Sequence, residues 1–328
     1  MTETTLSRAQ AGDGDAFREL TDPYRRELQV HCYRILGSVQ DAEDVLQEAL
    51  LSAWRSIGSF DGGSLRAWLY RIATNRCLNH LRDQSRRPRT AGPLPFPTAA
   101  EPVPAGDPSW LEPYPDAWVD EVTPGPEARY EARESIALSF VSALQRLPAQ
   151  QRAVLVLRDA LGFPAFEAAE ILGTTPASVN SALLRARGSF DPPRDRDITP
   201  LPRSAEERAL VDRFVQAFEN VDVAEVVSLL TQDVRFAMPP EPIEFRGRTT
   251  VGEFIGSFFS WARQLKLVVT RANGQPAVAY YLPEPDTLAP RGNGLFVLDL
   301  RKDGVSGITR FGDPDLLARF DLPTVLPS

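Results

Sequence analysis

The sequence predicts a multidomain protein with two all-α domains followed by one α+β domain. Apolar residues recur at steps of three and four in the first part of the chain and again in its middle part, which is the spacing of amphipathic helices. The last part has helical patterns first and strand patterns after them, as is typical of an α+β domain. The 328 residues are enough for two or three domains, and 43% hydrophobic residues can supply their cores.

The first domain, residues 9–88, is predicted to be a helical bundle. Apolar side chains at helical spacing predict helices over Asp15–Leu20, Asp22–Leu36, Val39–Ile57 and Arg66–Arg87. Gly37 and Ser38 end the second of these helices, and the glycine-bearing loop Ser59–Leu65 precedes the last one.

The helix Val39–Ile57 has an acidic face. Asp41, Asp44 and Glu48 lie at positions i, i+3 and i+7, so their side chains point to the same side. Carboxylates near a helix start suit the helix dipole, so a solvated face is one explanation. A basic protein partner is the other, because complementary charge sets orientation and association rate.

The helix Arg66–Arg87 is basic. From Ser64 to Thr90 the sequence has seven arginines and one aspartate, a local charge of +6 (7 − 1). A solvated basic helix end is one interpretation, and a stripe that follows nucleic-acid phosphates is the other. The whole chain has a net charge of −8, which fits a subunit that relies on a larger partner for much of its grip on DNA.

The two histidines and two cysteines all lie in the first domain, as His31, Cys32, Cys77 and His80. Nitrogen and sulfur ligands suit zinc, but an adjacent pair and a C-x-x-H pair are not a usual spacing. We therefore expect no metal site and no cofactor. Two cysteines make no disulfide framework, the first residues are polar, and no apolar run approaches about 18 residues. These features predict a cytoplasmic protein without a signal peptide or a membrane span.

The next segment, residues 89–130, is predicted to be an acidic, proline-rich linker. Ala91–Glu127 holds ten prolines and seven acids but no Lys or Arg, so proline and charge repulsion should extend it. An inert spacer would have few aromatic residues, whereas Trp110–Trp118 reads WLEPYPDAW. We expect this aromatic segment to dock on a folded surface.

The second domain, residues 131–190, is predicted to contain a helix-turn-helix within Leu147–Phe190. Gly173 ends one amphipathic helix, and Thr175 and Pro176 begin the next as a hydroxyl cap and a first-position proline. The buried side of the last helix is predicted to carry Val179, Leu183 and Ala186. The alternative is a helical hairpin inside a core. The order of a helix, a glycine-bearing turn and a second helix that begins with small polar residues favours DNA binding.

A short charged linker, residues 191–203, precedes the last domain, residues 204–323. Ser204 and Glu207 form a capping box for an amphipathic helix over Glu206–Asn220. Further helices are predicted over Val223–Leu230 and Thr249–Leu265. Strands are predicted over Val234–Met238, Leu267–Arg271, Ala277–Leu282, Gly294–Asp299 and Val305–Phe311.

Several motifs in order resemble the extracytoplasmic-function (group four) sigma factors, which are the promoter-recognition subunits of bacterial RNA polymerase. The stretches DAEDVLQEALLSAW and LRAWLYRIATN resemble sigma region 2, and the pattern LPxxQRxVxxLRD with the helix-turn-helix after it resembles region 4. The last domain, with FENxDVxxVVSLLTxDVxFxMPP, resembles SnoaL-like domains of the nuclear-transport-factor superfamily, which fold as an α+β cone. The segment WLEPYPDAW resembles a linker signature of sigma factors that carry such an extension.

The resemblance implies roles for residues at matching positions. It implies core RNA polymerase as a partner, through its β′ clamp and β flap, and promoter DNA as the other partner. In the family, the linker threads the active cleft and the RNA exit channel of the polymerase. The candidate contacts to the β′ clamp are Asp41, Glu43, Asp44 and Gln47. The candidate contacts to the minus-ten element are Phe60, Asp61, Gly62 and Ser64 in the loop and Arg71, Asn75, Arg76, Asn79 and Arg82 on the helix.

For the minus-thirty-five element the candidate residues are Ala177, Ser178, Asn180, Ser181, Arg185 and Arg187. Here the chain has Asn180, Ala182 and Leu184 where the family often has charged residues, which leaves fewer charges for phosphates. The candidate residues of a regulatory linker are Trp110, Leu111, Pro113, Tyr114, Pro115 and Trp118.

Two other function classes stay open at this point. One is a SnoaL-type isomerase or cyclase with a fused DNA-binding module, in which a cavity carboxylate or histidine moves a proton. Its candidate groups are Asp233, Glu241, Glu244, Tyr280 and Tyr281, because the last domain has no histidine. A docking cavity, open to a small-molecule ligand, would be lined by Phe236, Met238, Phe258, Trp261 and Tyr281. The other class is a free repressor or activator, which the ordered resemblance to regions 2 and 4 disfavours.

Overall fold

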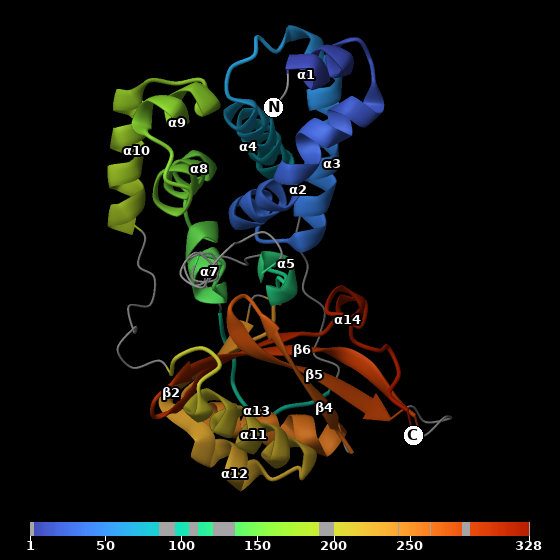
Figure 1. Ribbon diagram of the computed structural model, residues 1–328. Coiled ribbons are helices and arrows are strands. Elements are labelled where there is room, and N and C mark those ends of the chain that lie inside the picture. Colours follow the sequence, from blue (N-terminus) through green and yellow to red (C-terminus); the bar gives the residue numbers. More distant parts are fainter. Residues whose placement is uncertain are drawn as a thin grey trace. The chain divides into compact units, whose positions relative to one another are not determined.

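The computed structural model describes residues 3–84, 96–104, 111–120, 135–189, 200–241, 243–262, 264–283 and 289–327. The chain forms two compact units (Figure 1). One comprises Met1–Arg89 with Trp118–Pro192, and we call it the helical unit. The other comprises Thr90–Ala117 with Pro193–Ser328, and we call it the cone unit. Much of the segment expected to be a linker therefore belongs to the cone unit.

The first part of the helical unit is a bundle, as the apolar spacing predicts. Its helices are α1 (Glu3–Gln10), α2 (Gly14–Leu36), α3 (Val39–Ser56), η1 (Ile57–Ser59) and α4 (Leu65–Gln84). The Asp13 carboxylate caps α2 by accepting hydrogen bonds from the backbone of Asp15 and Ala16, and Gly37 ends α2 at a φ of 77°. The predicted break before Asp22 is wrong, because α2 continues through Pro23. Buried side chains before and after the proline hold both halves against the bundle.

The second part of the helical unit contains the predicted helix-turn-helix. Its elements are α7 (Leu138–Gln145), α8 (Ala149–Leu155), the π-helical turn η2 (Val156–Ala160), α9 (Ala165–Leu172) and α10 (Pro176–Ser189). Gly173 ends α9 at a φ of 62°, and the Thr175 hydroxyl accepts a hydrogen bond from the backbone of Ser178 at 3.2 Å. Val179, Leu183 and Ala186 are buried, as predicted. A short helix, α5 (Asp116–Asp120), precedes this part.

The cone unit is built on a curved seven-stranded sheet in the order β1-β3-β2-β7-β6-β5-β4. The strands are β1 (Val103–Pro104), β2 (Leu230–Ala237), β3 (Ile243–Arg246), β4 (Lys266–Ala272), β5 (Gln275–Pro283), β6 (Pro290–Arg301) and β7 (Gly304–Phe311). The pair β2–β7 is parallel and the others are antiparallel, so the sheet is mixed. The predicted strands locate β4 to β7 and the second half of β2, whereas β1 and β3 were not predicted.

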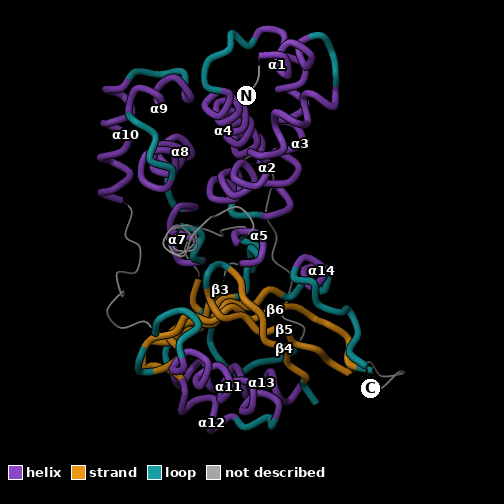
Figure 2. The backbone as a smooth tube through the Cα atoms, viewed as in Figure 1, coloured by secondary structure: helices purple, strands orange, loops and turns teal. Residues whose placement is uncertain are grey.

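Helices cover the concave side of this sheet. Figure 2 shows α11 (Ala205–Glu219), α12 (Val223–Leu229) and α13 (Arg248–Trp261) gathered on one face of the sheet. The short helix α14 (Leu316–Arg319) follows the last strand. The space between helices and sheet is filled largely by aromatic rings: Phe214, Phe218, Phe236, Phe245, Phe254, Phe258, Phe259, Tyr280 and Phe296. The interior of the cone is therefore a packed aromatic core.

His31 makes the helical unit sensitive to acid. Its ring is fully buried against Tyr70, with ring centroids 4.8 Å apart, and its Nε2 is 2.8 Å from the Thr74 hydroxyl oxygen. Burial lowers the pKa of His31 to about 3, and the nearby charges of Arg34 and Arg66 act in the same direction. The folded protein thus keeps this imidazole neutral well below the pH at which the unfolded chain binds a proton.

We expect the stability of the helical unit to fall as pH drops below about 6.5, where the unfolded state gains a proton that the folded state excludes. From pH 7 to pH 5 the loss from His31 is about 2 kcal/mol. Urea unfolding at both pH values measures it. The variant His31→Gln, which cannot titrate, should show a correspondingly smaller loss, and an equal loss in both proteins would contradict the assignment.

Candidate functional site

The acidic face of α3 is only partly open. Asp44 and Gln47 are exposed, whereas Asp41 and Glu43 are half-buried. One Asp41 oxygen lies 3.4 Å from His80 Nε2, and the Gln29 side chain donates a hydrogen bond to Glu43 at 3.3 Å. Of the four candidate clamp residues, Asp44 and Gln47 therefore point outward, and Asp41 and Glu43 also hold α3 to its neighbours in the bundle.

The loop between α3 and α4 has a buried and an exposed side. Phe60 is buried against Trp68, with ring centroids 5.1 Å apart, and Gln10 donates a hydrogen bond to the Phe60 carbonyl at 2.9 Å. Asp61, Gly62 and Ser64 are exposed. This loop therefore presents polar groups outward and keeps its aromatic ring in the core.

Four of the predicted α4 residues form one exposed stripe. Arg71, Asn75, Asn79 and Arg82 follow one another at steps of four, four and three, so they share a helix face. Arg76 is half-buried and donates a hydrogen bond to the Ser52 hydroxyl at 2.6 Å. The stripe combines two guanidinium groups with two amides, a set of donors suited to phosphates and base edges.

The outer face of α10 carries the residues predicted to contact the minus-thirty-five element. All six of them are exposed: Ala177, Ser178, Asn180, Ser181, Arg185 and Arg187. Leu184 is also 75% exposed on this helix. Arg187 is engaged within the unit, because its guanidinium donates hydrogen bonds of 3.0 and 2.7 Å to the Asp159 carboxylate.

The two parts of the helical unit pack directly against each other. Phe163, between η2 and α9, is buried and lies edge-on to Tyr70 of α4 at a centroid distance of 5.1 Å. The Arg66 guanidinium lies over both rings, 4.8 Å from Tyr70 and 4.9 Å from Phe163. Arg66 also forms an ion pair with Glu27 at 3.2 Å. The basic helix α4 is thus anchored to the helix-turn-helix through an aromatic and charged cluster.

A buried arginine strengthens the same contact. Arg152 of α8 donates a hydrogen bond to the Ile35 carbonyl of α2 at 2.5 Å, and further bonds to the Gln145 side chain and the Leu147 carbonyl. The Arg34 guanidinium of α2 donates to the Ser135 carbonyl at 3.3 Å. Trp118 belongs to this unit as well, with the Arg26 guanidinium 5.0 Å from its ring centre.

In the cone unit, the turn between β4 and β5 holds the linker by its backbone. The side-chain oxygen of Asn273 accepts a hydrogen bond from the Tyr114 N–H at 2.8 Å, and the Tyr114 carbonyl accepts one from the Asn273 N–H at 2.8 Å. Asn273 is completely buried and has a φ of 57°, a conformation that asparagine tolerates better than most residues. Leu111, Pro113, Tyr114 and Pro115 are buried, whereas Trp110 lies outside the described residues.

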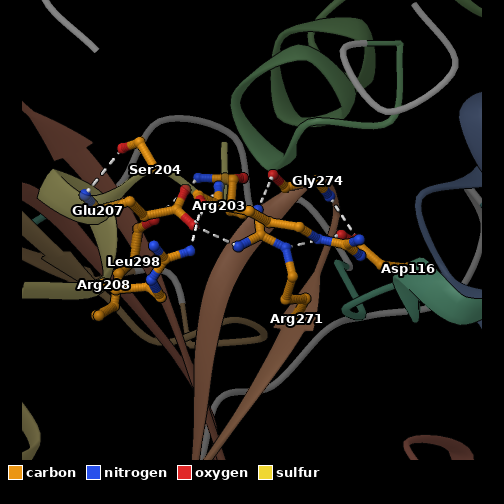
Figure 3. Close-up of polar contacts among 9 residues, drawn as sticks. Asp116, Arg203, Ser204, Glu207, Arg208, Arg271, Gly274 and Leu298 are labelled. Atoms are coloured by element: carbon orange, nitrogen blue, oxygen red, sulfur yellow. Dashed lines mark hydrogen bonds and ion pairs between the residues drawn. The ribbon is translucent and has the colours of Figure 1, made fainter. Parts of the chain in front are cut away.

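Arg271 connects the same linker segment to the start of α11 (Figure 3). Its guanidinium contacts the Asp116 carboxylate at 3.3 Å and the Glu207 carboxylate at 2.6 Å, and it donates to the Gly274 carbonyl at 2.8 Å. Asp116 in turn accepts a hydrogen bond from the Gly274 N–H at 2.6 Å. A third contact joins Glu112 to Arg319 of α14 at 3.0 Å. We call these contacts of Leu111–Asp116 the linker clamp.

The carboxylates considered for acid–base chemistry lie outside the aromatic core of the cone. Asp233 pairs with Arg301 at 2.9 Å, and hydrogen bonds from Thr231 and Arg301 lower its pKa. Glu244 pairs with Arg246. Burial raises the pKa of the Asp299 carboxyl, a residue that the sequence analysis did not select.

The tyrosines considered with them are packed. Burial raises the pKa of Tyr280, and its ring stacks on Phe296 at a centroid distance of 4.6 Å. Tyr281 donates its hydroxyl hydrogen to the Pro323 carbonyl at 3.0 Å.

The structure also bears on the metal and membrane expectations. Among the described residues, no group of three or more His, Cys, Asp or Glu side chains is placed to hold a metal ion. His31 and His80 contact Thr74 and Asp41 instead, and Cys32 and Cys77 are buried. No helix in the described ranges is long and apolar enough to cross a membrane.

Comparisons with known proteins identify the family. Residues 20–87 match the model for Sigma-70 region 2, residues 137–189 match Sigma-70 region 4, and residues 211–304 match the SnoaL-like domain. The ECF RNA polymerase sigma factor SigG of Mycobacterium tuberculosis (strain H37Rv) is 41% identical over 94% of this chain and 85% of its own length. The chain belongs to the ECF sigma factors. It binds core RNA polymerase and directs promoter recognition and transcription initiation.

Other sigma factors extend the match over the cone unit. SigJ of Mycobacterium tuberculosis (strain H37Rv) is 32% identical over 84% of this chain and 86% of its own. The crystal structure of SigJ from that species matches with a TM-score of 0.61 at 25% identity and covers 94% of this chain and 99% of that one. The similarity to SigG and SigJ therefore extends beyond the two sigma regions of this chain into its SnoaL-like domain.

Sequence reasoning missed the residues that join elements far apart in the chain. Phe163 and Arg66 were not selected, and neither were Arg271 and Asn273 of the linker clamp. The dipeptide Asn273-Gly274 between two strand patterns was a signal for the β4–β5 hairpin, because both residues accept the positive φ that such turns require. Nothing local in the sequence indicated that this turn would bind residues 111–116.

The pairing of Arg187 with Asp159 predicts how this sigma factor responds to loss of one carboxylate. We expect Asp159→Asn to free Arg187 for a phosphate, so that holoenzyme binds promoter DNA more tightly and the slope of log affinity against log salt steepens by up to about 1. Titrations at several salt concentrations measure the slope. The double variant with Arg187→Ala is the control and should lose the gain; an unchanged slope in Asp159→Asn would refute the role of Arg187.

Proposed function

We propose that the SnoaL-like domain of this sigma factor controls promoter recognition by holding the linker between regions 2 and 4. The observation that carries the proposal is the linker clamp, in which Asn273 and Arg271 bind the backbone and the acid of Leu111–Asp116. In the family, this linker enters the polymerase cleft, so a linker bound to the cone unit must leave it first. The clamp therefore opposes formation of the active holoenzyme.

The strength of the clamp follows from burial. An exposed ion pair contributes little, but the side chains of Arg271, Asp116 and Glu207 are only 17%, 4% and 8% exposed. Removing one partner from such a set leaves a charge without compensation in a poorly solvated site. Tyr114 and Asn273 are completely buried too, so release would exchange their two hydrogen bonds for bonds to water, at a net cost of about 0.5–1.5 kcal/mol each. Release of the linker is thus costly as long as nothing replaces these contacts.

Holding the linker also limits the reach of region 2. From the end of α4 at Gln84 to Phe96, the first described residue of the linker, the chain has twelve steps (96 − 84). Twelve residues span at most about 43 Å when fully extended. From Gln84 to Ser135, the first described residue of the second helical part, there are 51 steps (135 − 84) when the linker is free. Capture therefore adds a short tether between region 2 and the cone unit within the longer connection between regions 2 and 4.

For the DNA and polymerase contacts we propose an assignment based on exposure. Asp44 and Gln47 meet the β′ clamp, with Asp41 and Glu43 at the edge of the contact, and region 4 meets the β flap. Asp61, Gly62, Ser64 and the α4 stripe meet the minus-ten element, and Phe60 supports the loop from within. On α10, the serines and Asn180 read base edges, Arg185 and Arg187 bind phosphates, and Leu184 meets thymine methyl groups.

We propose no enzymatic activity for the cone unit. Acid–base catalysis needs a titratable group within reach of a substrate. Among the described residues, the buried titratable groups of the cone include Tyr280, whose ring is stacked in the aromatic core, and Asp299, which accepts a hydrogen bond from Gln275, so both are engaged in packing or hydrogen bonding. The carboxylates Asp233 and Glu244 are held by arginines outside that core. A regulatory role needs only binding, which the linker clamp supplies.

One prediction from this proposal concerns the polymerase contact. We expect Asp44→Lys to lower the affinity for core polymerase about tenfold at low salt, because it places a positive charge against a basic partner. Binding of labelled sigma factor to core at two salt concentrations measures the change. Asp22→Lys, at an exposed acid on α2, makes the same charge change and should bind like wild type. Equal affinities for the two variants would place the polymerase contact elsewhere.

Another prediction from this proposal concerns the linker clamp. Asn273→Gly keeps the positive φ but removes the acceptor for the Tyr114 N–H, which weakens the clamp by about 1–3 kcal/mol. We expect in vitro transcription with core polymerase to rise at least about fivefold at limiting sigma factor, since 1 kcal/mol already shifts an equilibrium by about that factor.

Asn273→Asp is the matched control, because its carboxylate still accepts a hydrogen bond from the Tyr114 N–H. Its transcription should stay near that of wild type. A loss of transcription in Asn273→Gly, or the same rise in both variants, would contradict the proposal that the clamp opposes initiation.

A further inference from the structure

A second stretch of the linker, Phe96–Pro104, is built into the cone unit. Phe96 and Ala100 are 5% and 3% exposed and belong to the aromatic core of the cone. In Figure 1 this segment runs as a teal trace beside α13. The stretch lies outside the linker clamp, and neither its sequence nor its family resemblance marked it as a binding element.

The Phe96 ring packs on one face of α13. It stacks on Trp261 with centroids 5.5 Å apart and an interplanar angle of 29°, and it contacts Phe254 at 5.5 Å and Phe258 at 5.8 Å. These three residues follow one another at steps of four and three along the helix, so they form one aromatic stripe. Trp261 is 41% exposed, which places it at the rim of the core. Phe96 thus covers the stripe at the place where the core meets solvent.

Phe96 joins an aromatic column that runs from Trp261 at the rim into the cone. Phe254 contacts Phe236 at 4.8 Å and Phe245 at 4.2 Å, and Phe258 contacts Tyr280 and Phe296 at 6.2 and 6.1 Å. Every inner member of the column comes from the cone's own strands and helices. Phe96 alone among these contacts is supplied by the linker, 140 residues before Phe236, the nearest of them in the chain (236 − 96).

Backbone pairing fixes the segment that follows. Val103 and Pro104 pair antiparallel with Glu244 and Ile243, so β1 extends the sheet beyond β3. Between the ring and the strand, the Thr98 hydroxyl accepts a hydrogen bond from the Ala100 N–H at 3.1 Å and turns the chain. A side-chain anchor followed by strand addition at a sheet edge is a known way for a folded domain to bind a peptide.

We propose that the cone unit is a receptor for this chain's own Phe96–Pro104 segment, with the Phe96 ring as the ligand that closes the aromatic core. The inference rests on the proposed control of the linker, because it names a second point at which the cone unit holds it. It also gives the SnoaL-like domain an occupant: a proline-flanked aromatic residue of the same protein takes the place of a small molecule.

Removing the ring tests the proposal without polymerase. Phe96→Ala should leave an apolar cavity bounded by Phe254, Phe258 and Trp261, because a packed core relaxes only partly around a lost side chain. Such cavities stay dry and bind small aromatic molecules. We expect the full-length variant to unfold several degrees below wild type, and indole to raise its midpoint in a saturable way. Wild type should not respond to indole.

The control is Glu101→Ala, which removes an exposed side chain from the same segment and should match wild type in midpoint and in its lack of response to indole. Stabilisation of wild type by indole equal to that of Phe96→Ala would show that Phe96 does not close the core. A midpoint for Phe96→Ala equal to that of Glu101→Ala would overturn the proposal as well.

A second measurement keeps the ring and so does not depend on the variant folding. With 4-fluorophenylalanine at position 96 of the full chain, the fluorine resonance should lie away from its random-coil position and be insensitive to exchange of H₂O for D₂O. A random-coil resonance with a full solvent isotope shift would refute burial of Phe96. Because neither measurement involves transcription, failure here is distinguishable from failure of the linker clamp to oppose initiation.

Discussion

The two hydrogen bonds between Asn273 and Tyr114 are the contact on which the capture of the linker depends. Asn273 presents both its N–H and its side-chain oxygen to one residue of the linker because it sits at a positive φ in the β4–β5 turn. Both groups are buried, so the turn needs Tyr114 as a partner as much as the linker needs the turn. Arg271 adds two ion pairs to these hydrogen bonds. Its guanidinium contacts both Asp116 and Glu207 at a site with little access to water.

In the proposed mechanism, this arrangement links promoter recognition to the state of the cone unit. Regions 2 and 4 carry the surfaces for DNA, and the segment between them is anchored at Phe96, at β1 and at Leu111–Asp116. Within the helical unit, Arg66 and Arg152 further join the two regions through Phe163 and the Ile35 carbonyl. By the same proposal, a sigma factor held in this way exchanges intramolecular contacts for contacts with polymerase and DNA, and the balance between the two would set its activity.

Much of the fold could be predicted from the sequence because its signals are local. The cap at Thr175, the turn at Gly173 and the apolar stripe of α10 define the helix-turn-helix, and period-two patterns locate the strands β4 to β7. What could not be predicted depends on distant partners. Strand β1 has two residues and no pattern of its own, and Phe96 looks like any aromatic residue in a proline-rich linker. The exposure of Asp44 and burial of Phe60 likewise follow from packing that no single helix reveals.

The most direct test of the account is hydrogen exchange at the Tyr114 amide, which donates to Asn273 in the captured linker. The account predicts slow exchange in the free sigma factor, since this N–H is buried and bonded, and fast exchange once core polymerase binds and the linker leaves the cone unit. Mass spectrometry of peptides that contain residue 114, with and without core, reports both states. Fast exchange in the free protein, or unchanged protection in a transcribing holoenzyme, would contradict the claim that the cone unit controls initiation by holding the linker.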